Sequence, residues 1–100
     1  MYGSKEFIKG AIEVVYDLAK SSLDPTDNIT FTPYNVYVVS HSYILGNQKA
    51  MLSTTLPDGK YYEVTYNADK DEMYVDTYMR VMNTAYKHVE SEEGSFYIQK

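Results

Sequence analysis

The stretch that decides the fold spans residues 34–78 and reads YNVYVVSHSYILGNQKAMLSTTLPDGKYYEVTYNADKDEMYVDTY. It is dense in Tyr, Val and Thr, whose aromatic and β-branched side chains fit a pleated, half-buried surface. Turn-forming residues interrupt it at Gly46-Asn47, Asp58-Gly59 and Asp69-Lys70-Asp71. The pattern therefore predicts an antiparallel meander with strands over residues 34–45, 49–56, 60–68 and 73–78.

The two short turns and the first strand carry specific expectations. Gly46-Asn47 suits a type II′ turn and Asp58-Gly59 a type I′ turn. In the first strand, strict alternation places Val36 and Val38 on one face and His41 on the other. Both faces are apolar near the middle, which indicates a central strand or one that is covered on both sides.

Residues 4–23 predict one amphipathic helix. Ser4 suits the N-cap, and Asp24-Pro25 ends the helix because a residue before Pro is pushed out of the helical region. Apolar residues recur at three- and four-residue steps: Phe7, Ile8, Ala11, Ile12, Val15, Leu18 and Ala19. Because the meander needs a cover, we expect an α+β fold in which this N-terminal helix packs on an antiparallel sheet of four to five strands.

The segment after Asp71 allows two interpretations. Tyr74, Val75 and Thr77 favour a strand that runs to about Met82, whereas a capping pattern and apolar residues at helical steps allow a helix over residues 72–90. From about residue 87 to 100 the chain closes a weak hairpin or frays as an acidic tail. No linker or repeat divides the sequence, so we expect one domain over residues 1–100.

Composition excludes several classes of function. The chain has 100 residues, 9 Lys plus Arg against 14 Asp plus Glu, a net charge of −5 and no Cys. A phosphate backbone is repelled by this charge, so we expect no direct nucleic-acid binding. Disulfides, zinc–cysteine sites and thiol catalysis are excluded, and no apolar run approaches the length of a membrane span. We expect a cytoplasmic protein without a membrane segment.

Candidate catalytic and metal-binding residues form no familiar constellation. Neighbours on a strand point to opposite faces, so His41 in Ser40-His41-Ser42 cannot activate either serine. His88 stands alone, far along the chain. The carboxylates Asp69, Asp71, Glu72 and Asp76 lack the regular ligand spacing of a calcium loop, which favours a solvated turn. We expect a protein that is not an enzyme and that has no catalytic residues, metal or cofactor.

A resemblance enters through the middle of the chain. Residues 35–39, 49–67 and 69–76, with the phrase Leu23-Asp24-Pro25-Thr26-Asp27, resemble a small uncharacterised family of phages and prophages of Gram-positive bacteria. The segment Ser40-His41-Ser42 and the tail after Tyr86 depart from the family pattern. The resemblance implies no activity, but a phage origin favours a protein that binds a host protein.

The hypothesis that follows is an inhibitor or modulator of a host system, of which an anti-CRISPR-like counter-defence protein is one form. Twelve tyrosines among 100 residues favour an exposed aromatic contact surface. Its carboxylates would meet the basic groove of a nucleic-acid-binding nuclease. The predicted partner-binding residues are Tyr61, Asp69, Asp71, Glu72, Tyr74, Asp76, Tyr78, Glu90, Glu92 and Glu93.

Two alternatives stay open at this point. A helix-covered sheet, often dimeric, can form a pocket that sequesters a small nucleotide-like ligand, with Tyr rings stacking on the base. The scarcity of Arg and the absence of a phosphate-binding loop count against it. The other alternative is a self-associating accessory protein, such as a homodimer.

Overall fold

The computed structural model describes residues 3–26 and 28–100, so Asp27 of the family-like phrase and the first two residues lie outside it. Its elements follow the order helix, short 3-10 helix and six strands. They are α1 (Ser4–Ser21), η1 (Pro33–Asn35), β1 (Val36–Ile44), β2 (Asn47–Thr54), β3 (Lys60–Asn67), β4 (Glu72–Met79), β5 (Tyr86–Ser91) and β6 (Gly94–Gln99).

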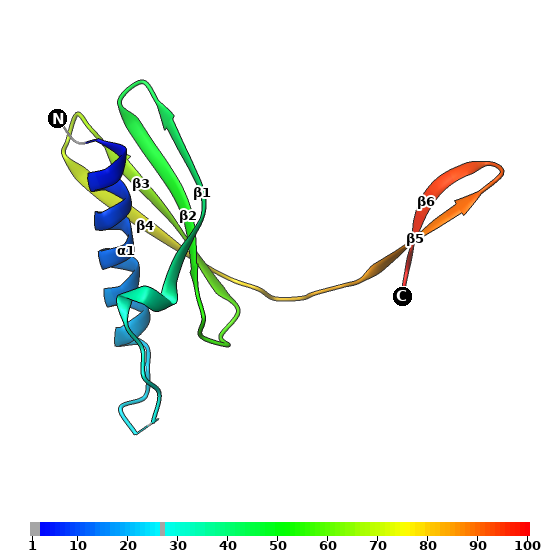
Figure 1. The fold of residues 1–100 in the computed structure, drawn as a ribbon, viewed down its shortest axis with the longest axis horizontal. Coiled ribbons are helices and arrows are strands. Elements are labelled where there is room, and N and C mark those ends of the chain that lie inside the picture. The colour runs from blue at the N-terminus through cyan, green and yellow to red at the C-terminus, as the bar shows by residue number, and fades with distance from the viewer. Residues whose placement is uncertain (1–2, 27) are drawn as a thin grey trace.

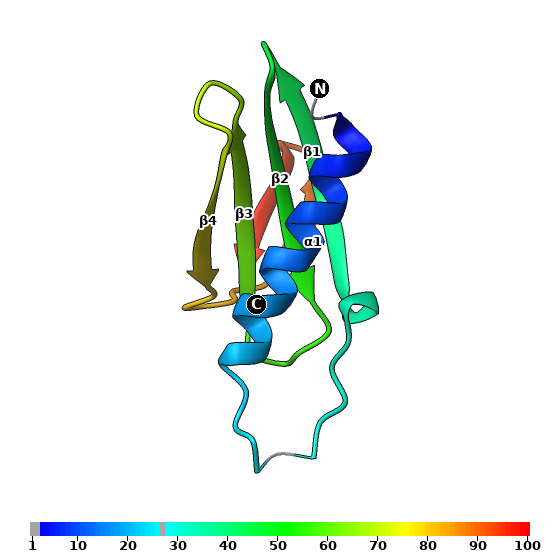
Figure 2. The same cartoon turned by 90° about the vertical axis from the view of Figure 1, so that its left-hand side faces the viewer.

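The first four strands form an antiparallel meander in the order β1-β2-β3-β4, and α1 lies across one of its faces (Figures 1 and 2). The predicted α+β class, with the N-terminal helix on a meander, is confirmed. β1 lies at the edge of the sheet, so its expected central position is wrong. Within residues 3–26 and 28–100, strands β5 and β6 pair only with each other, in a second, two-stranded sheet.

The core lies between α1 and the first three strands. Four helix residues at four-residue steps are buried: Phe7, Ala11, Val15 and Ala19. They pack against the inner face of the sheet, whose buried side chains include Leu52, Tyr62 and Val64. Period-four spacing on the helix and period-two spacing on the strands thus bring two apolar faces together.

A β-bulge changes the face assignment in β1. The register of β1 against β2 shifts between Val38 and Ser40, so that His41 lies opposite the buried Ala50. Val36, Val38 and His41 therefore share the face beneath α1, and strict alternation is wrong beyond Val39. The His41 ring stacks on Phe7 with 5.4 Å between the ring centroids.

The turns also differ from expectation. The two-residue loop between β1 and β2 is Leu45-Gly46, and both residues have positive φ (52° and 84°), as a type I′ turn requires. The β2–β3 loop spans residues 55–59, in which only Gly59 has positive φ (69°), so it is not a type I′ turn. The helix begins after Gly3, its N-cap, rather than at a capping Ser4.

β4 ends at Met79, three residues before the predicted end. β3 begins at Lys60, and the last backbone bond across this pair runs from the Arg80 amide to the Gly59 carbonyl, at 2.9 Å. Beyond it the chain has no neighbouring strand to bond. The expectation of a sequence without a linker is wrong here: residues 80–85 form an extended linker that leaves the sheet on the side opposite α1 and leads to the β5–β6 hairpin (Figures 1 and 2).

The hairpin gives the molecule an elongated shape. The radius of gyration is 18.0 Å and the principal extents are 56 × 44 × 19 Å. A compact 100-residue domain has a radius of gyration of about 13 Å. Within residues 3–26 and 28–100, no helix is both long and apolar enough to span a bilayer.

Truncation of Leu52, which is fully buried, tests this core. Leu52→Ala should lower the free energy of unfolding by about 3 kcal/mol, because it removes apolar contacts and leaves a cavity under α1. Leu45→Ala is the matched control: Leu45 is 95% exposed, and its loss should cost no more than about 0.5 kcal/mol. Urea unfolding followed by circular dichroism measures both. Equal losses in the two variants would contradict the placement of the core.

Candidate functional site

The face of the sheet opposite α1 is the candidate site. Tyr62 and Val64 point toward α1 and are buried, so the residues between and beside them in β3 point away from it. Directly paired residues on antiparallel strands share a face, and Tyr61 pairs with Tyr78. The tyrosines and carboxylates that β3 and β4 present here, together named the acidic tyrosine face, are Tyr61, Glu63, Glu72, Tyr74, Asp76 and Tyr78.

The three tyrosines of this face are partly open to solvent. Tyr61 is 39% exposed, and Tyr74 and Tyr78 are each 41% exposed. The rings of Tyr61 and Tyr78 stack with 5.1 Å between centroids and an interplanar angle of 14°. Mutual stacking restricts both rings already in the free protein. The two side chains therefore lose little conformational entropy when a partner covers their apolar surface.

Negative charge is concentrated beside these rings. Glu63 lies directly opposite Asp76, a like-charge arrangement that is unfavourable within a sheet. Lys49 on β2 approaches Glu63 at 3.4 Å and offsets one of the two charges. Within the part of the chain that the structure describes, the Asp76 carboxylate forms no ion pair, and it is exposed. The face therefore carries net negative charge.

Glu72 and Tyr74 form a second pairing on the same face. The Tyr74 hydroxyl donates a hydrogen bond to the Glu72 carboxylate. This hydrogen bond is the main cause that raises the pKa of Tyr74, because ionisation would remove the donated proton and place two negative charges together. The interaction orients the phenol at neutral pH without removing the ring from solvent.

The other predicted turn carboxylates have different roles. Asp71 has φ 49° and accepts a hydrogen bond of 2.7 Å from the Tyr66 hydroxyl, so it holds the β3–β4 turn in place. The Asp69 amide donates to the side chain of Asn67, and the Asp69 side chain is exposed at the turn. These two acids border the acidic tyrosine face at its turn end.

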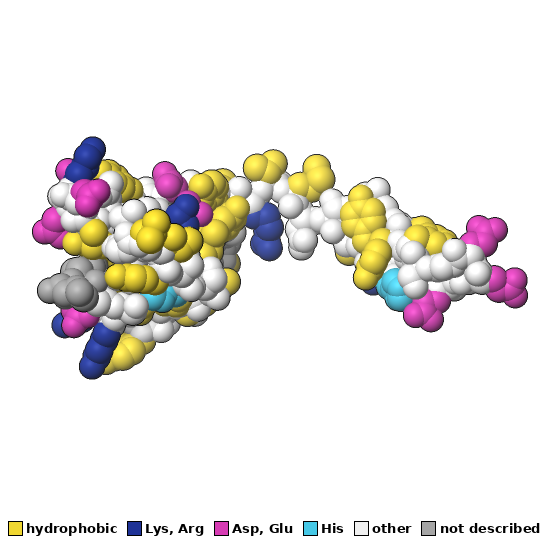
Figure 3. All heavy atoms as spheres, turned by 90° about the horizontal axis from the view of Figure 1, so that it is seen from above, with side chains coloured by type: hydrophobic (Ala, Val, Ile, Leu, Met, Phe, Trp, Pro, Cys, Tyr) yellow, Lys and Arg dark blue, Asp and Glu magenta, His cyan; other side chains and the backbone are white. Residues whose placement is uncertain are grey.

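Glu90, Glu92 and Glu93 lie apart from the sheet. They are exposed on the β5–β6 hairpin, and Figure 3 shows its carboxylates at the end of the molecule remote from α1 and the sheet. The predicted set of ten residues therefore divides into seven on the sheet and its turn and three on the hairpin.

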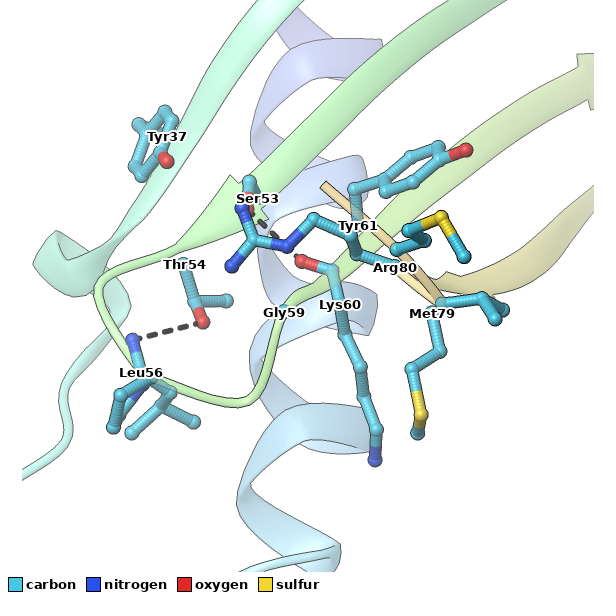
Figure 4. A pocket seen from close by; sticks show the side chains of 12 residues that line it. Tyr37, Ser53, Thr54, Leu56, Gly59, Lys60, Tyr61, Met79 and Arg80 are labelled. Carbon is cyan, nitrogen blue, oxygen red and sulfur yellow. Dashed lines mark hydrogen bonds between the residues drawn. The ribbon is translucent and has the colours of Figure 1, made fainter. Parts of the chain in front are cut away.

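The sequence analysis did not predict a groove that lies at the end of the sheet opposite the β3–β4 turn. It has a volume of about 840 Å³ and lies where β1, the β2–β3 loop and the start of the linker meet. Tyr37, Leu56 and Tyr61 supply apolar surface. The Arg80 side chain lies over Gly59, while Lys60 extends its ammonium along the rim (Figure 4). Only strand register brings these distant residues together, so no local motif marks the groove.

The two histidines have structural contacts. His41 Nε2 lies 2.9 Å from Gln48 Oε1, and the His88 ring leans against Tyr97 with 5.2 Å between centroids. Among residues 3–26 and 28–100, no three His, Asp or Glu side chains are placed to hold one metal ion. What the acidic tyrosine face can supply to a partner is therefore contact area and negative charge.

Comparison with models of known protein families gives a match over most of the chain. The model of a family described as a family of unknown function (DUF6275) matches residues 8–88. This range takes in most of α1, all of β1–β4 and the linker, and it ends within β5. No curated protein and no solved structure matches the chain.

The hydrogen bond between Tyr74 and Glu72 can be tested by titration. Glu72→Gln should lower the pKa of Tyr74 toward the ordinary tyrosine value, because the charge that opposes ionisation is removed. Asp76→Asn is the control: it removes a charge from the same strand and face, and it should leave Tyr74 unchanged. The ¹³C shift of the Tyr74 ring, followed against pH by NMR, reports the pKa. An equal response to both variants would show a general field effect instead.

Proposed function

Given that the chain belongs to DUF6275, a family of unknown function, we propose that it acts without catalysis, by binding a basic surface on another protein. The observation that supports this proposal is the acidic tyrosine face. Three partly exposed tyrosines and uncompensated carboxylates lie together on rigid strands, on the side of the sheet that α1 leaves open.

The tyrosines suit a binding role for an energetic reason. Tyr buries a large area and has few rotatable bonds, so it is enriched among residues that dominate binding energy. The stacked Tyr61–Tyr78 pair and the hydrogen-bonded Tyr74 are already oriented in the free protein. A partner would therefore meet a preorganised surface and lose less entropy on association.

The charge of the face selects the class of partner. Glu72 and Asp76 are exposed, and complementary charge accelerates encounter with a basic surface. A groove that binds nucleic acid, such as that of a nuclease, is basic because it must neutralise phosphates. The resemblance to phage and prophage proteins makes a host protein of this kind the partner we propose, with steric inhibition in the manner of a counter-defence protein as the mechanism.

The surroundings of the histidines support a non-catalytic role. The His41 side chain is exposed, and its ring stacks on Phe7 and contacts Gln48 at the edge of the core. Ser40 lies opposite Met51 and His41 opposite Ala50, so the neighbouring serine side chain points to the other face of the sheet. General base catalysis needs a base within hydrogen-bond distance of the group it activates.

The groove favours one alternative function. Its volume of about 840 Å³ is that of a small-molecule site, and aromatic rings lie there beside Lys60 and Arg80. A nucleotide could stack its base on Tyr37 or Tyr61 and place its phosphate near Arg80. Calorimetric titration with cyclic dinucleotides tests this alternative. It predicts saturable heat that Arg80→Ala abolishes, and the absence of heat would rule out these ligands.

Charge reversal on the acidic tyrosine face tests the main proposal. Glu72→Lys/Asp76→Lys should reduce the association rate with the partner about tenfold and weaken its salt dependence, because steering charge is lost. Tagged protein first captures the partner from nuclease-treated Gram-positive lysate, and mass spectrometry identifies it. Surface plasmon resonance at two salt concentrations then measures association with the purified partner.

The matched control reverses two acids on the other side of the molecule. Glu13 and Asp17 are exposed on α1, so Glu13→Lys/Asp17→Lys changes the net charge by the same amount. This variant should retain most of the association rate. Equal rates for the two variants would show that net charge, and not the acidic tyrosine face, governs binding.

A further inference from the structure

The β5–β6 hairpin exposes an apolar face. Val89 lies opposite Phe96, and Ile98 lies two residues further along β6, so all three share one side of the hairpin. Phe96 and Ile98 are each about half exposed. Tyr97 and His88 form the other side. Such alternation is typical of strands with one covered face.

A two-stranded hairpin is not stable on its own. Two strands without a third strand or a helix against them are marginally stable at best in water. In residues 3–26 and 28–100, β5 and β6 pair only with each other, and none of the residues in these two strands is buried. The hairpin therefore needs another surface on which to bury Val89, Phe96 and Ile98.

The linker presents the hairpin to a surface outside its own sheet. Residues 80–85 read RVMNTA, without Gly or Pro, and they run extended. Their first residues, Arg80, Val81 and Met82, line the groove, and the chain then leads away from it. Figures 1 and 2 show that the hairpin lies away from the sheet, on the side opposite α1.

The groove and the hairpin are complementary in charge as well as in polarity. The residues that line the groove include Lys60 and Arg80 but no Asp or Glu. The hairpin carries Glu90, Glu92 and Glu93 at and beside its turn. Lys87 lies on the apolar side of the hairpin, opposite Ile98 and away from the turn. Both elements thus have apolar surface, with bases in the groove and acids at the hairpin turn, and this pattern is typical of the two halves of an interface.

We propose that the hairpin of one copy docks in the groove of a second copy, and that the exchange is reciprocal about a two-fold axis. Val89, Phe96 and Ile98 cover the apolar part of the groove, and Glu92 and Glu93 approach Lys60 and Arg80. Exchange of an identical element is a low-cost route to a dimer, because the two-fold axis forms the same hairpin–groove contact twice.

This dimer shares Tyr61 with the acidic tyrosine face but none of that face's carboxylates. The groove lies at the end of the sheet where the β2–β3 loop is, whereas Glu72 and Tyr74 lie toward the β3–β4 turn at the other end. Reversal of Glu72 and Asp76 should therefore leave the oligomeric state unchanged, and failure of one proposal does not entail failure of the other.

Sedimentation velocity over a concentration series, using the full chain, tests the exchange. The wild type should be a dimer, and Phe96→Asp should raise its dissociation constant tenfold or more because a charge enters the apolar contact. Tyr97→Asp is the matched control on the other side of the hairpin, and it should dimerise like the wild type. Circular dichroism should show α1 and the main sheet intact in both, since the hairpin does not pack on them.

Charge exchange identifies the contact itself. Glu92→Lys/Glu93→Lys and Lys60→Glu/Arg80→Glu should each weaken the homodimer, since like charges then meet at both contacts. An equimolar mixture of the two variants should form heterodimers, visible by native mass spectrometry, because opposite charges meet again at both. A monomeric wild type, equal effects of Phe96→Asp and Tyr97→Asp, or no heterodimer in the mixture would overturn the proposal.

Discussion

Burial of the α1 stripe against the inner face of β1–β3 is the interaction on which the rest of the structure depends. Phe7, Leu52 and Val64 are removed from water together, and the sheet has no other helix on it in the part of the chain described. A sheet of four strands has two faces, and one helix can cover only one of them. The core thus fixes which side chains are buried and, by alternation, which remain on the open face.

The open face is chemically uneven, and this unevenness follows from where each turn lies. The β3–β4 turn places Asp69 and Asp71 beside Glu72, at one end of the sheet. The β2–β3 loop and the end of β4 place Lys60 and Arg80 at the other. One surface therefore holds an acidic region at one end and a groove lined by basic residues at the other.

Much of the fold could be predicted because its signals are local. Helical periodicity from Phe7 to Ala19 and β-rich segments between turns identify elements without knowledge of distant contacts. The bulge at Val39 left no such signal, since Val38 and Val39 are both apolar and suit either face of the strand. The sequence analysis therefore assigned His41 to the wrong side.

Tyr61, Tyr74, Asp76 and Tyr78 could be grouped because they alternate on adjacent strands, whereas Tyr37, Leu56 and Arg80 meet only through strand register. Glu90, Glu92 and Glu93 could not be placed relative to the sheet, because among the described residues β5 and β6 pair with no strand of the meander.

The bulge at Val39 has a consequence for solubility in a molecule that leaves an aromatic face open. β1 is an edge strand, and a regular edge offers unpaired amides and carbonyls on which another chain can add a strand. A bulge bends and twists the strand and interrupts its hydrogen-bonding pattern, so a straight incoming strand cannot match it along its length. The opposite edge, β4, carries Glu72 and Asp76, which disfavour stacking of identical edges by charge repulsion. Both margins of the sheet thus resist fibril-like growth, while its face stays free to bind.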